Sequence, residues 1–174
     1  MQRQTDTEKQ IKNALTNLLK NKQLETITIT DITRAAHINR GTFYLHYMDK
    51  YDMMEQLISH ILDYIFQLLS THREPEELFP VTVQVLTYLK EDYNFIYAIE
   101  RNSPQYLDNA LNQFFDTIIE NLPQLKKDLR SHPYLPYDYA RQIFIRTNTE
   151  IVMFWINKGC PETPDKIAKM LLQV

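Results

Sequence analysis

Side chains that can hydrogen-bond to a nucleic acid are concentrated between residues 28 and 50. This stretch contains Thr28, Arg34, Asn39, Arg40, Thr42, Tyr44, His46 and Lys50. An arginine can form two parallel hydrogen bonds to a guanine base, and a threonine methyl can pack against the methyl of thymine. Lysine, tyrosine and histidine can donate to phosphate oxygens, which positions a protein on DNA without reading its sequence. The stretch therefore predicts contact with double-stranded DNA.

Two short helices joined by a tight turn are expected to hold these side chains. Thr28 and Asp31 form a capping-box pattern, so the first helix should begin near Ile29. Residues 27–30 are also β-branched, as in a strand, but the cap and the helical spacing that follows favour a helix.

The second helix is predicted from residue 40 to about residue 46, with Asn39 as its N-cap. Phe43 and Tyr47 lie four residues apart and can face inward together. Gly41 would let this helix approach DNA or a neighbouring helix closely.

The order of small, aromatic and basic residues in this stretch is specific. It consists of Ile32, Ala36, Ile38, Asn39, Arg40, Gly41, Thr42, Phe43, Tyr44, His46, Tyr47 and Lys50. It resembles the helix-turn-helix of the tetracycline-repressor (TetR) family of bacterial transcription regulators, and the resemblance covers roughly residues 7–60. The chain departs from the family at His37, where Gly is usual, at Thr33, where Ala is usual, and mildly at Met53, a Leu-like position. Histidine tolerates a left-handed backbone better than most residues other than glycine, so the turn remains feasible.

The resemblance implies roles for individual residues. Tyr44, His46 and Lys50 match family positions that contact DNA phosphates, whereas Arg40 and Thr42 match positions that approach bases. The alternative for the three phosphate-contact positions is that Tyr44 is a part-buried tyrosine and that His46 and Lys50 are ordinary surface residues. The other members of the predicted DNA interface are Thr28, Arg34, Asn39 and Gly41. For Thr28 the alternative is that it only caps the helix and makes no contact with DNA.

Composition and periodicity predict an all-α fold. Only two of the 174 residues are glycine, which disfavours all-β folds and glycine-rich phosphate loops. Apolar spacing predicts about nine helices, with a charged loop over residues 126–137 and a boundary at residues 73–77. The main segments are a first helix with a capping-box candidate at Thr7, a long linker helix to about 71, and helices through 81–89, 95–101, 104–122, 138–158 (closed by Gly159) and from 164 onward.

The charge is distributed unevenly along the chain. Residues 1–51 carry a net charge of +3, whereas the remainder carries −6 and the whole chain −3. The positive excess falls on the stretch that is predicted to bind DNA, as phosphate binding requires.

The family layout implies a DNA-binding domain at residues 1–50 and an effector-binding and dimerisation domain at residues 51–174. Residues that could line an effector pocket are Ile61, Ile65, Phe95, Phe114, Ile118, Phe144 and Asn148. Residues that could form a dimer interface on the last two helices are Ala140, Ile151, Trp155, Ile167, Met170 and Leu171. For both sets the alternative is plain intrachain core.

Several classes of function are disfavoured. The sequence lacks the glycine-rich nucleotide loops, the Gly-x-Ser-x-Gly motif and the His-Glu-x-x-His motif, so we expect no enzyme, cofactor or metal. No apolar run is long enough to span a membrane, the first residues do not resemble a signal peptide, and the single Cys160 cannot form an intrachain disulfide. A cytoplasmic protein is expected.

The sequence thus predicts a homodimeric transcriptional repressor that binds palindromic DNA and is released by an effector, either a small molecule or a protein. The alternative is a regulator or co-regulator that responds to a protein partner and has no small-molecule ligand.

Overall fold

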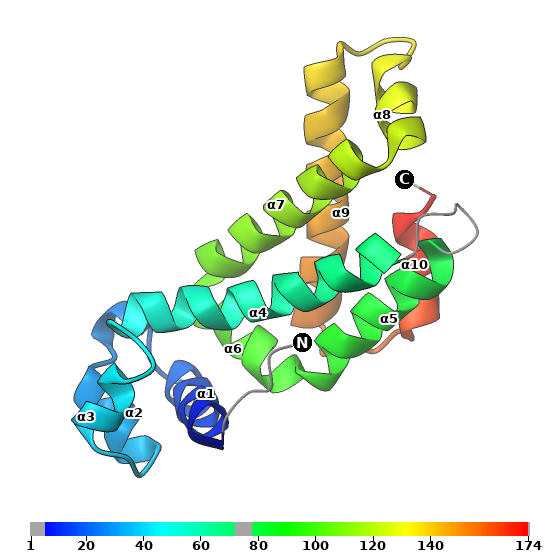
Figure 1. The fold of residues 1–174 in the computed structure, drawn as a ribbon. Coiled ribbons are helices and arrows are strands. Elements are labelled where there is room, and N and C mark those ends of the chain that lie inside the picture. Colours follow the sequence, from blue (N-terminus) through cyan, green and yellow to red (C-terminus); the bar gives the residue numbers. More distant parts are fainter. Residues whose placement is uncertain (1–5, 72–77, 174) are drawn as a thin grey trace. The chain divides into compact units, whose positions relative to one another are not determined.

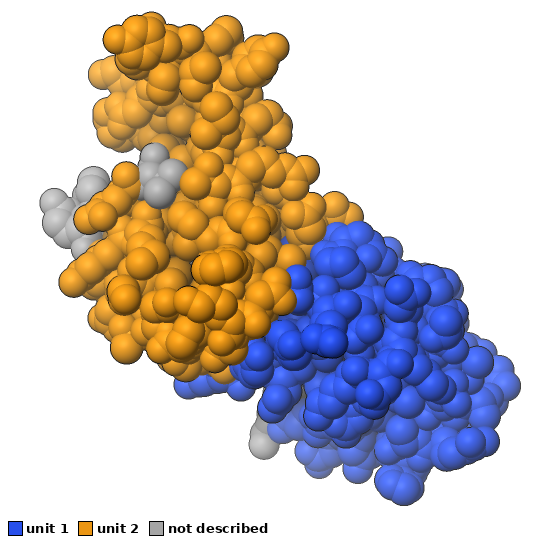
Figure 2. Space-filling model, turned by 180° about the vertical axis from the view of Figure 1, so that it is seen from behind, with its two compact units in different colours: residues 1–71, 91–107 blue, residues 72–90, 108–174 orange. Residues whose placement is uncertain are grey.

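The computed structural model describes residues 6–71 and 78–173, and this part of the chain is all-helical (Figure 1). Its elements are α1 (Asp6–Leu19), a 3-10 turn η1 (Leu24–Thr26), α2 (Ile29–Ala35), α3 (Arg40–Tyr44), α4 (Lys50–Thr71), α5 (Leu78–Glu91), α6 (Tyr93–Asn102), α7 (Pro104–Asn121), α8 (Pro123–Arg130), α9 (Tyr137–Asn157) and α10 (Pro164–Leu171). The all-α prediction is confirmed. The described residues form two compact units, 6–71 with 91–107 and 78–90 with 108–173 (Figure 2).

The first unit is built around α1, which packs against α2 and α6. The apolar side of α1 is fully buried at Ile11, Leu15 and Leu19. A polar contact also joins α1 to the start of α6, because Lys12 of α1 forms an ion pair with Asp92, the N-cap of α6. The first unit therefore joins the N-terminal helices to a segment about 80 residues further along the chain.

The turn between α2 and α3 contains the left-handed residue that the sequence requires. His37 has a φ of 54°. Its N–H donates to the Arg34 carbonyl at 3.3 Å, and the Ile38 N–H donates to the Thr33 carbonyl at 3.0 Å. This is the Schellman pattern that usually ends a helix at glycine, formed here around a histidine.

Helix α3 is shorter than predicted. It ends at Tyr44 rather than near residue 46, with Leu45 as its C-cap. The backbone still turns after this point, since the N–H groups of His46 and Tyr47 both donate to the Phe43 carbonyl at 3.0 Å. Phe43 and Tyr47 are buried, as their spacing predicted.

In the second unit, α9 packs against α8 and α10. Helix α9 ends in the same Schellman pattern as α2, with Gly159 at a φ of 84°. The Gly159 N–H donates to Ile156 and the Cys160 N–H donates to Trp155, both at 2.9 Å. The prediction that Gly159 closes this helix is confirmed, with the glycine directly after the C-cap residue Lys158.

Three expectations about the helices need correction. Residues 126–137 are not all loop, because α8 runs through Pro123–Arg130. Pro123 suits the first turn of a helix, and Lys127 and Arg130 lie in the last turn, where cations stabilise a helix. The described residues therefore contain ten α-helices rather than about nine. Thr7 lies inside α1, which begins at Asp6, so it is not the cap.

The predicted boundary at residues 73–77 lies outside the described residues. The division into domains at residues 1–50 and 51–174 stays a prediction. None of the helices described here is long and apolar enough to cross a membrane.

Candidate nucleic-acid interface

The first turn of α3 is fixed by Asn39. Its carboxamide oxygen accepts hydrogen bonds from the Thr42 backbone N–H at 2.7 Å and from the Thr42 hydroxyl at 3.1 Å. A Cβ added to Gly41 would lie 3.1 Å from the same oxygen and would otherwise point into open space. Asn39 and Thr42 thus secure the start of the helix, and the surface over Gly41 is accessible to a close partner.

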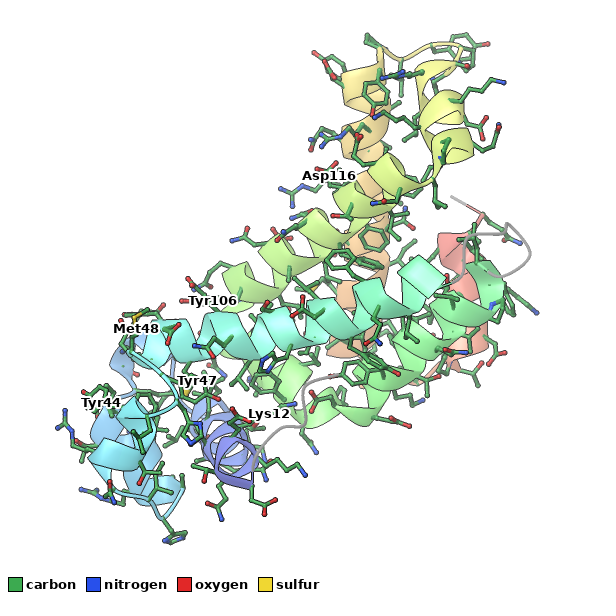
Figure 3. All side chains as sticks on the ribbon, viewed as in Figure 1. Lys12, Tyr44, Tyr47, Met48, Tyr106 and Asp116 are labelled. Carbon is green, nitrogen blue, oxygen red and sulfur yellow. The ribbon has the colours of Figure 1, made fainter. Side chains whose placement is uncertain are left out.

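Arg40 and Tyr44 form an exposed polar face on α3. The Arg40 Nη2 donates to the Tyr44 hydroxyl at 3.3 Å, and the guanidinium carbon lies 6.0 Å from the centre of the Tyr44 ring. Tyr44 is 49% exposed, and its ring meets that of the buried Phe43 edge-on. In Figure 3 Tyr44 lies on the side of α3 away from α1. A cation and a hydroxyl are therefore presented together on the outer side of this helix.

The capping box of α2 is formed as predicted. The Thr28 hydroxyl accepts a hydrogen bond from the Asp31 N–H at 3.1 Å, and the Asp31 carboxylate accepts one from the Thr28 N–H at 3.1 Å. The Thr28 hydrogen bonds, helped by the nearby cations of Lys22 and Arg34, hold the pKa of Asp31 below its ordinary value. Arg34 is exposed in the last turn of α2. The roles of Thr28 and Arg34 in DNA binding stay predictions.

His46 connects the end of α3 to α1. Its Nδ1 lies 3.6 Å from a Glu8 carboxylate oxygen, and each of the two side chains is 22% exposed. Next to it, Tyr47 is buried, and its hydroxyl has no hydrogen-bond partner among the described residues. Burial, reinforced by the carboxylates of Glu8 and Asp52, raises the pKa of Tyr47 to about 12. A phosphate contact by His46 stays a prediction.

Lys50 forms hydrogen bonds within the protein. Its ammonium donates to three backbone carbonyls of the segment before α2, those of Leu24 at 2.8 Å, Glu25 at 2.7 Å and Ile27 at 2.8 Å. An ammonium has three hydrogens. All three are used inside the protein, so the geometry supports a role in holding this segment against α4 rather than a phosphate contact.

Two exposed apolar residues beside α3 were missed by the sequence reasoning. Leu45 is 84% exposed and Met48 is 78% exposed. An apolar residue next to a buried aromatic normally indicates core, so the sequence alone gave no reason to place either residue on the surface.

The predicted pocket residues are divided between the two units, and their role in an effector pocket stays a prediction. Ile61, Ile65 and Phe95 belong to the first unit, and the other four belong to the second. Within the second unit, the Asn148 amide donates to the Phe144 carbonyl at 2.8 Å, and the Phe144 ring meets Phe115 edge-on. Asn148 is fully buried, and its side-chain oxygen has no hydrogen-bond partner among the described residues.

Most of the predicted dimer residues are buried within the chain. Trp155 is 1% exposed and donates from Nε1 to the Glu162 carbonyl at 3.2 Å. Of the other predicted residues, Ala140, Ile167 and Leu171 are buried, Ile151 is intermediate and Met170 is 39% exposed. The large apolar side chains that α9 does expose are Tyr139, Ile143 and Phe154.

A short helix capped by Asn39, preceded by a second short helix and a left-handed turn, and presenting a cation and hydroxyls outward, defines a helix-turn-helix module. The chain belongs to the TetR family of transcriptional regulators, since its residues 76–174 match the TetR-family model described as the transcriptional regulator C-terminal region.

Comparison with individual proteins agrees with this family. The chain is similar to the HTH-type transcriptional regulator YxbF of Bacillus subtilis (strain 168), with 22% identity over 187 residues, covering 96% of this chain and 44% of that protein. The chain thus spans less than half the length of this curated relative.

Solved structures share the fold. A TetR transcriptional regulator from Streptococcus agalactiae 2603V superposes with a TM-score of 0.67 at 21% identity, covering 96% of this chain and 92% of that one. The transcriptional regulator FadR from Bacillus subtilis, solved in complex with stearoyl-CoA, superposes with a TM-score of 0.65 at 19% identity, covering 95% of each chain.

Proposed function

We propose that this chain is a transcriptional repressor that binds a palindromic DNA operator as a homodimer and releases it when an effector binds. Such a regulator acts on the bacterial chromosome and therefore in the cytoplasm. The observation that carries the proposal is the exposed face of α3. Arg40 and Tyr44 stand together on a helix whose inner side is anchored by Phe43 and whose start is capped by Asn39.

The proposal uses α3 as the helix that enters the major groove. Readers of this class meet base edges with the first turn of the second helix, and Arg40 is the first residue of α3. A guanidinium at this position can form a bidentate contact to guanine. Tyr44, one turn later, can donate its hydroxyl to a phosphate.

The test is binding-site selection with the wild-type protein and the Arg40→Ala variant, followed by titration at two salt concentrations. A base contact predicts a loss of about 1–3 kcal/mol in binding and a relaxed preference at one base pair of each half-site. A phosphate contact alone predicts a similar loss on every sequence and a salt slope reduced by about one for each contact. An unchanged motif with unchanged affinity would leave Arg40 a solvated surface residue and would contradict its role in reading the operator.

Dimerisation is assigned to the exposed face of α9. Tyr139, Ile143 and Phe154 are 66%, 52% and 60% exposed, and large apolar patches of this kind mark protein interfaces. Phe154→Glu should convert a dimer into a particle of the 20.8 kDa chain mass in sedimentation. Glu91→Gln, a change at an exposed residue of α5 and so outside this face of α9, serves as the control and should leave the dimer intact. Wild-type protein that sediments as a monomer at micromolar concentration would contradict the assignment.

The effector site is assigned to the second unit around Asn148. A fully buried amide oxygen without a partner is unfavourable unless a donor reaches it. Asn148→Leu should therefore leave DNA affinity unchanged and weaken release by the effector. Acyl-CoA thioesters are the first probes for a release experiment, because FadR of Bacillus subtilis was solved with stearoyl-CoA. If neither acyl-CoAs nor a library of metabolites releases DNA, a protein partner becomes the effector to search for.

A further inference from the structure

The exposed apolar side chains of the first unit are gathered in one short segment. Among its described residues, the large hydrophobic side chains that are exposed are Tyr44 at 49%, Leu45 at 84%, Met48 at 78% and Tyr51 at 41%. All of them lie within eight residues, at the end of α3 and the start of α4. Leu45, the most exposed, has no polar group to direct it toward water. A leucine held in solvent at this place suggests a partner that covers it.

The backbone directs Leu45 away from the protein interior. Its φ and ψ of −74° and −22° continue the helix, and its N–H donates to the Gly41 carbonyl at 3.1 Å. Residues two apart on an α-helix point about 200° from each other, so Leu45 lies opposite the buried Phe43. It stands one turn beyond Gly41, on a strip next to the one formed by Arg40 and Tyr44.

We propose that Leu45 reads the C5 methyl group of a thymine in each half-site of the operator. This inference rests on the proposed function, because it places Leu45 on the same side of α3 that meets DNA. The thymine methyl is the apolar group that the major groove displays, and an aliphatic side chain recognises it by contact. The reading face of α3 then has a polar strip, Arg40 and Tyr44, and an apolar strip, Gly41 and Leu45.

Continuity with the polar strip identifies DNA as the occupant rather than a protein. The Arg40 guanidinium and the Tyr44 hydroxyl, which form the polar strip of the same helix, suit a polyanion with hydrogen-bonding bases. Gly41 leaves the neighbouring position open, so a base edge can come close to the helix axis.

Met48 provides a matched comparison. Its side chain is nearly as exposed as that of Leu45, but it lies beyond α3, beside the first turn of α4 in Figure 3. The Met48 N–H donates to the Asp52 carboxylate at 2.7 Å, and the Asp49 carboxylate accepts from the Tyr51 N–H at 2.8 Å. These contacts hold Met48 at the start of a different helix, so removing its side chain changes exposed apolar area without touching α3.

The experiment removes single methyl groups from the DNA. An operator obtained from the selection described above is prepared with each thymine replaced in turn by deoxyuridine, which lacks only the C5 methyl. Wild-type protein should bind about three- to fivefold more weakly per half-site at one of these positions. Leu45→Ala should bind the thymine operator with a similar loss and should be indifferent to deoxyuridine there. Leu45→Met should restore most of the methyl dependence, and Met48→Ala should behave as wild type.

The outcomes separate this inference from the proposed function. If wild type binds the operator and Leu45→Ala keeps the full deoxyuridine effect, Leu45 is not the methyl reader and the inference is overturned. If Met48→Ala, rather than Leu45→Ala, abolishes the effect, the assignment to Leu45 is likewise overturned. If the selection with wild type yields no DNA motif, it is the proposed function that fails.

Discussion

Replacing Lys50 by methionine removes a charge and three hydrogen bonds while keeping a side chain of similar length. The ammonium donates to the carbonyls of Leu24, Glu25 and Ile27 at 2.7–2.8 Å. These carbonyls belong to the segment that leads into the N-cap of α2 at Thr28. We expect Lys50→Met to loosen that segment and to lower the stability of the protein.

The magnitude follows from the environment of the three contacts. A hydrogen bond from a charged donor contributes about 1.5–3 kcal/mol. The contact to Glu25 is exposed, so water can replace the ammonium there, whereas those to Leu24 and Ile27 are part-buried. Counting mainly these two, and allowing for access of solvent to Lys50, we expect a loss of about 2–4 kcal/mol. For a chain of this length that corresponds to a fall in Tm of roughly 4–16 °C.

Thermal unfolding followed by circular dichroism measures this effect, and the salt dependence of DNA binding tests its cause. Lys20→Met is the matched control, because Lys20 is exposed and makes one exposed hydrogen bond, to Asn17 at 3.0 Å; its effect should be within about 0.5 kcal/mol. The salt slope of Lys50→Met should equal that of wild type. Unchanged stability together with a slope reduced by about one for each subunit would show instead that Lys50 contacts phosphate, and would refute this reasoning.

Three further substitutions test local features of the fold. His37→Gly should stabilise the protein by up to about 1 kcal/mol in urea unfolding, because a left-handed residue is strained unless it is glycine. Gly159→Ala, in the equivalent position after α9, should destabilise the protein for the same reason. Stability changes of the same sign for the two variants would contradict this explanation. Tyr47→Phe should be close to neutral at pH 7, because the hydroxyl is buried without a partner. The folded-state pKa of Tyr47, about 12, lies above its ordinary value of 10.0, so the unfolded chain loses this proton first and stability falls between these pH values. Urea titrations should give the variant an advantage over wild type of about 1.4 kcal/mol at pH 11 that vanishes at pH 8, and a difference independent of pH would exclude this effect.

The local features of the helix-turn-helix could be predicted from sequence because they depend on neighbours. The Thr28–Asp31 capping box, the Asn39 cap and the left-handed turn at His37 each involve residues within about five positions of one another. The inward pair Phe43 and Tyr47 follows from helical spacing alone. Such contacts leave a pattern in the sequence that physical chemistry can interpret.

Features that depend on distant parts of the chain could not be predicted in this way. The carbonyl partners of Lys50 lie 23 to 26 residues away, and backbone carbonyls leave no mark in a sequence. The prolines at 133 and 136 and the charges around them suggested a loop over residues 126–137. Both prolines follow the end of α8 at Arg130, so they do not interrupt this helix. Along α9, Phe154 and Trp155 are adjacent aromatics, and spacing alone did not decide that Trp155 would be buried and Phe154 exposed.

Because α3 is short, different side chains of this helix hold its conformation and contact its binding partner. A helix of five residues is far below the length at which a helix is stable alone, so its conformation depends on contacts outside itself. Those contacts come from the inner side and the ends: Phe43 in the core, Asn39 at the first turn, and Tyr47 beyond the last. The outward side chains Arg40 and Leu45 contribute little to holding the helix, since both are exposed. Substitutions at these two positions should therefore change what the helix binds while leaving its fold intact, whereas substitutions at the inner positions should change both.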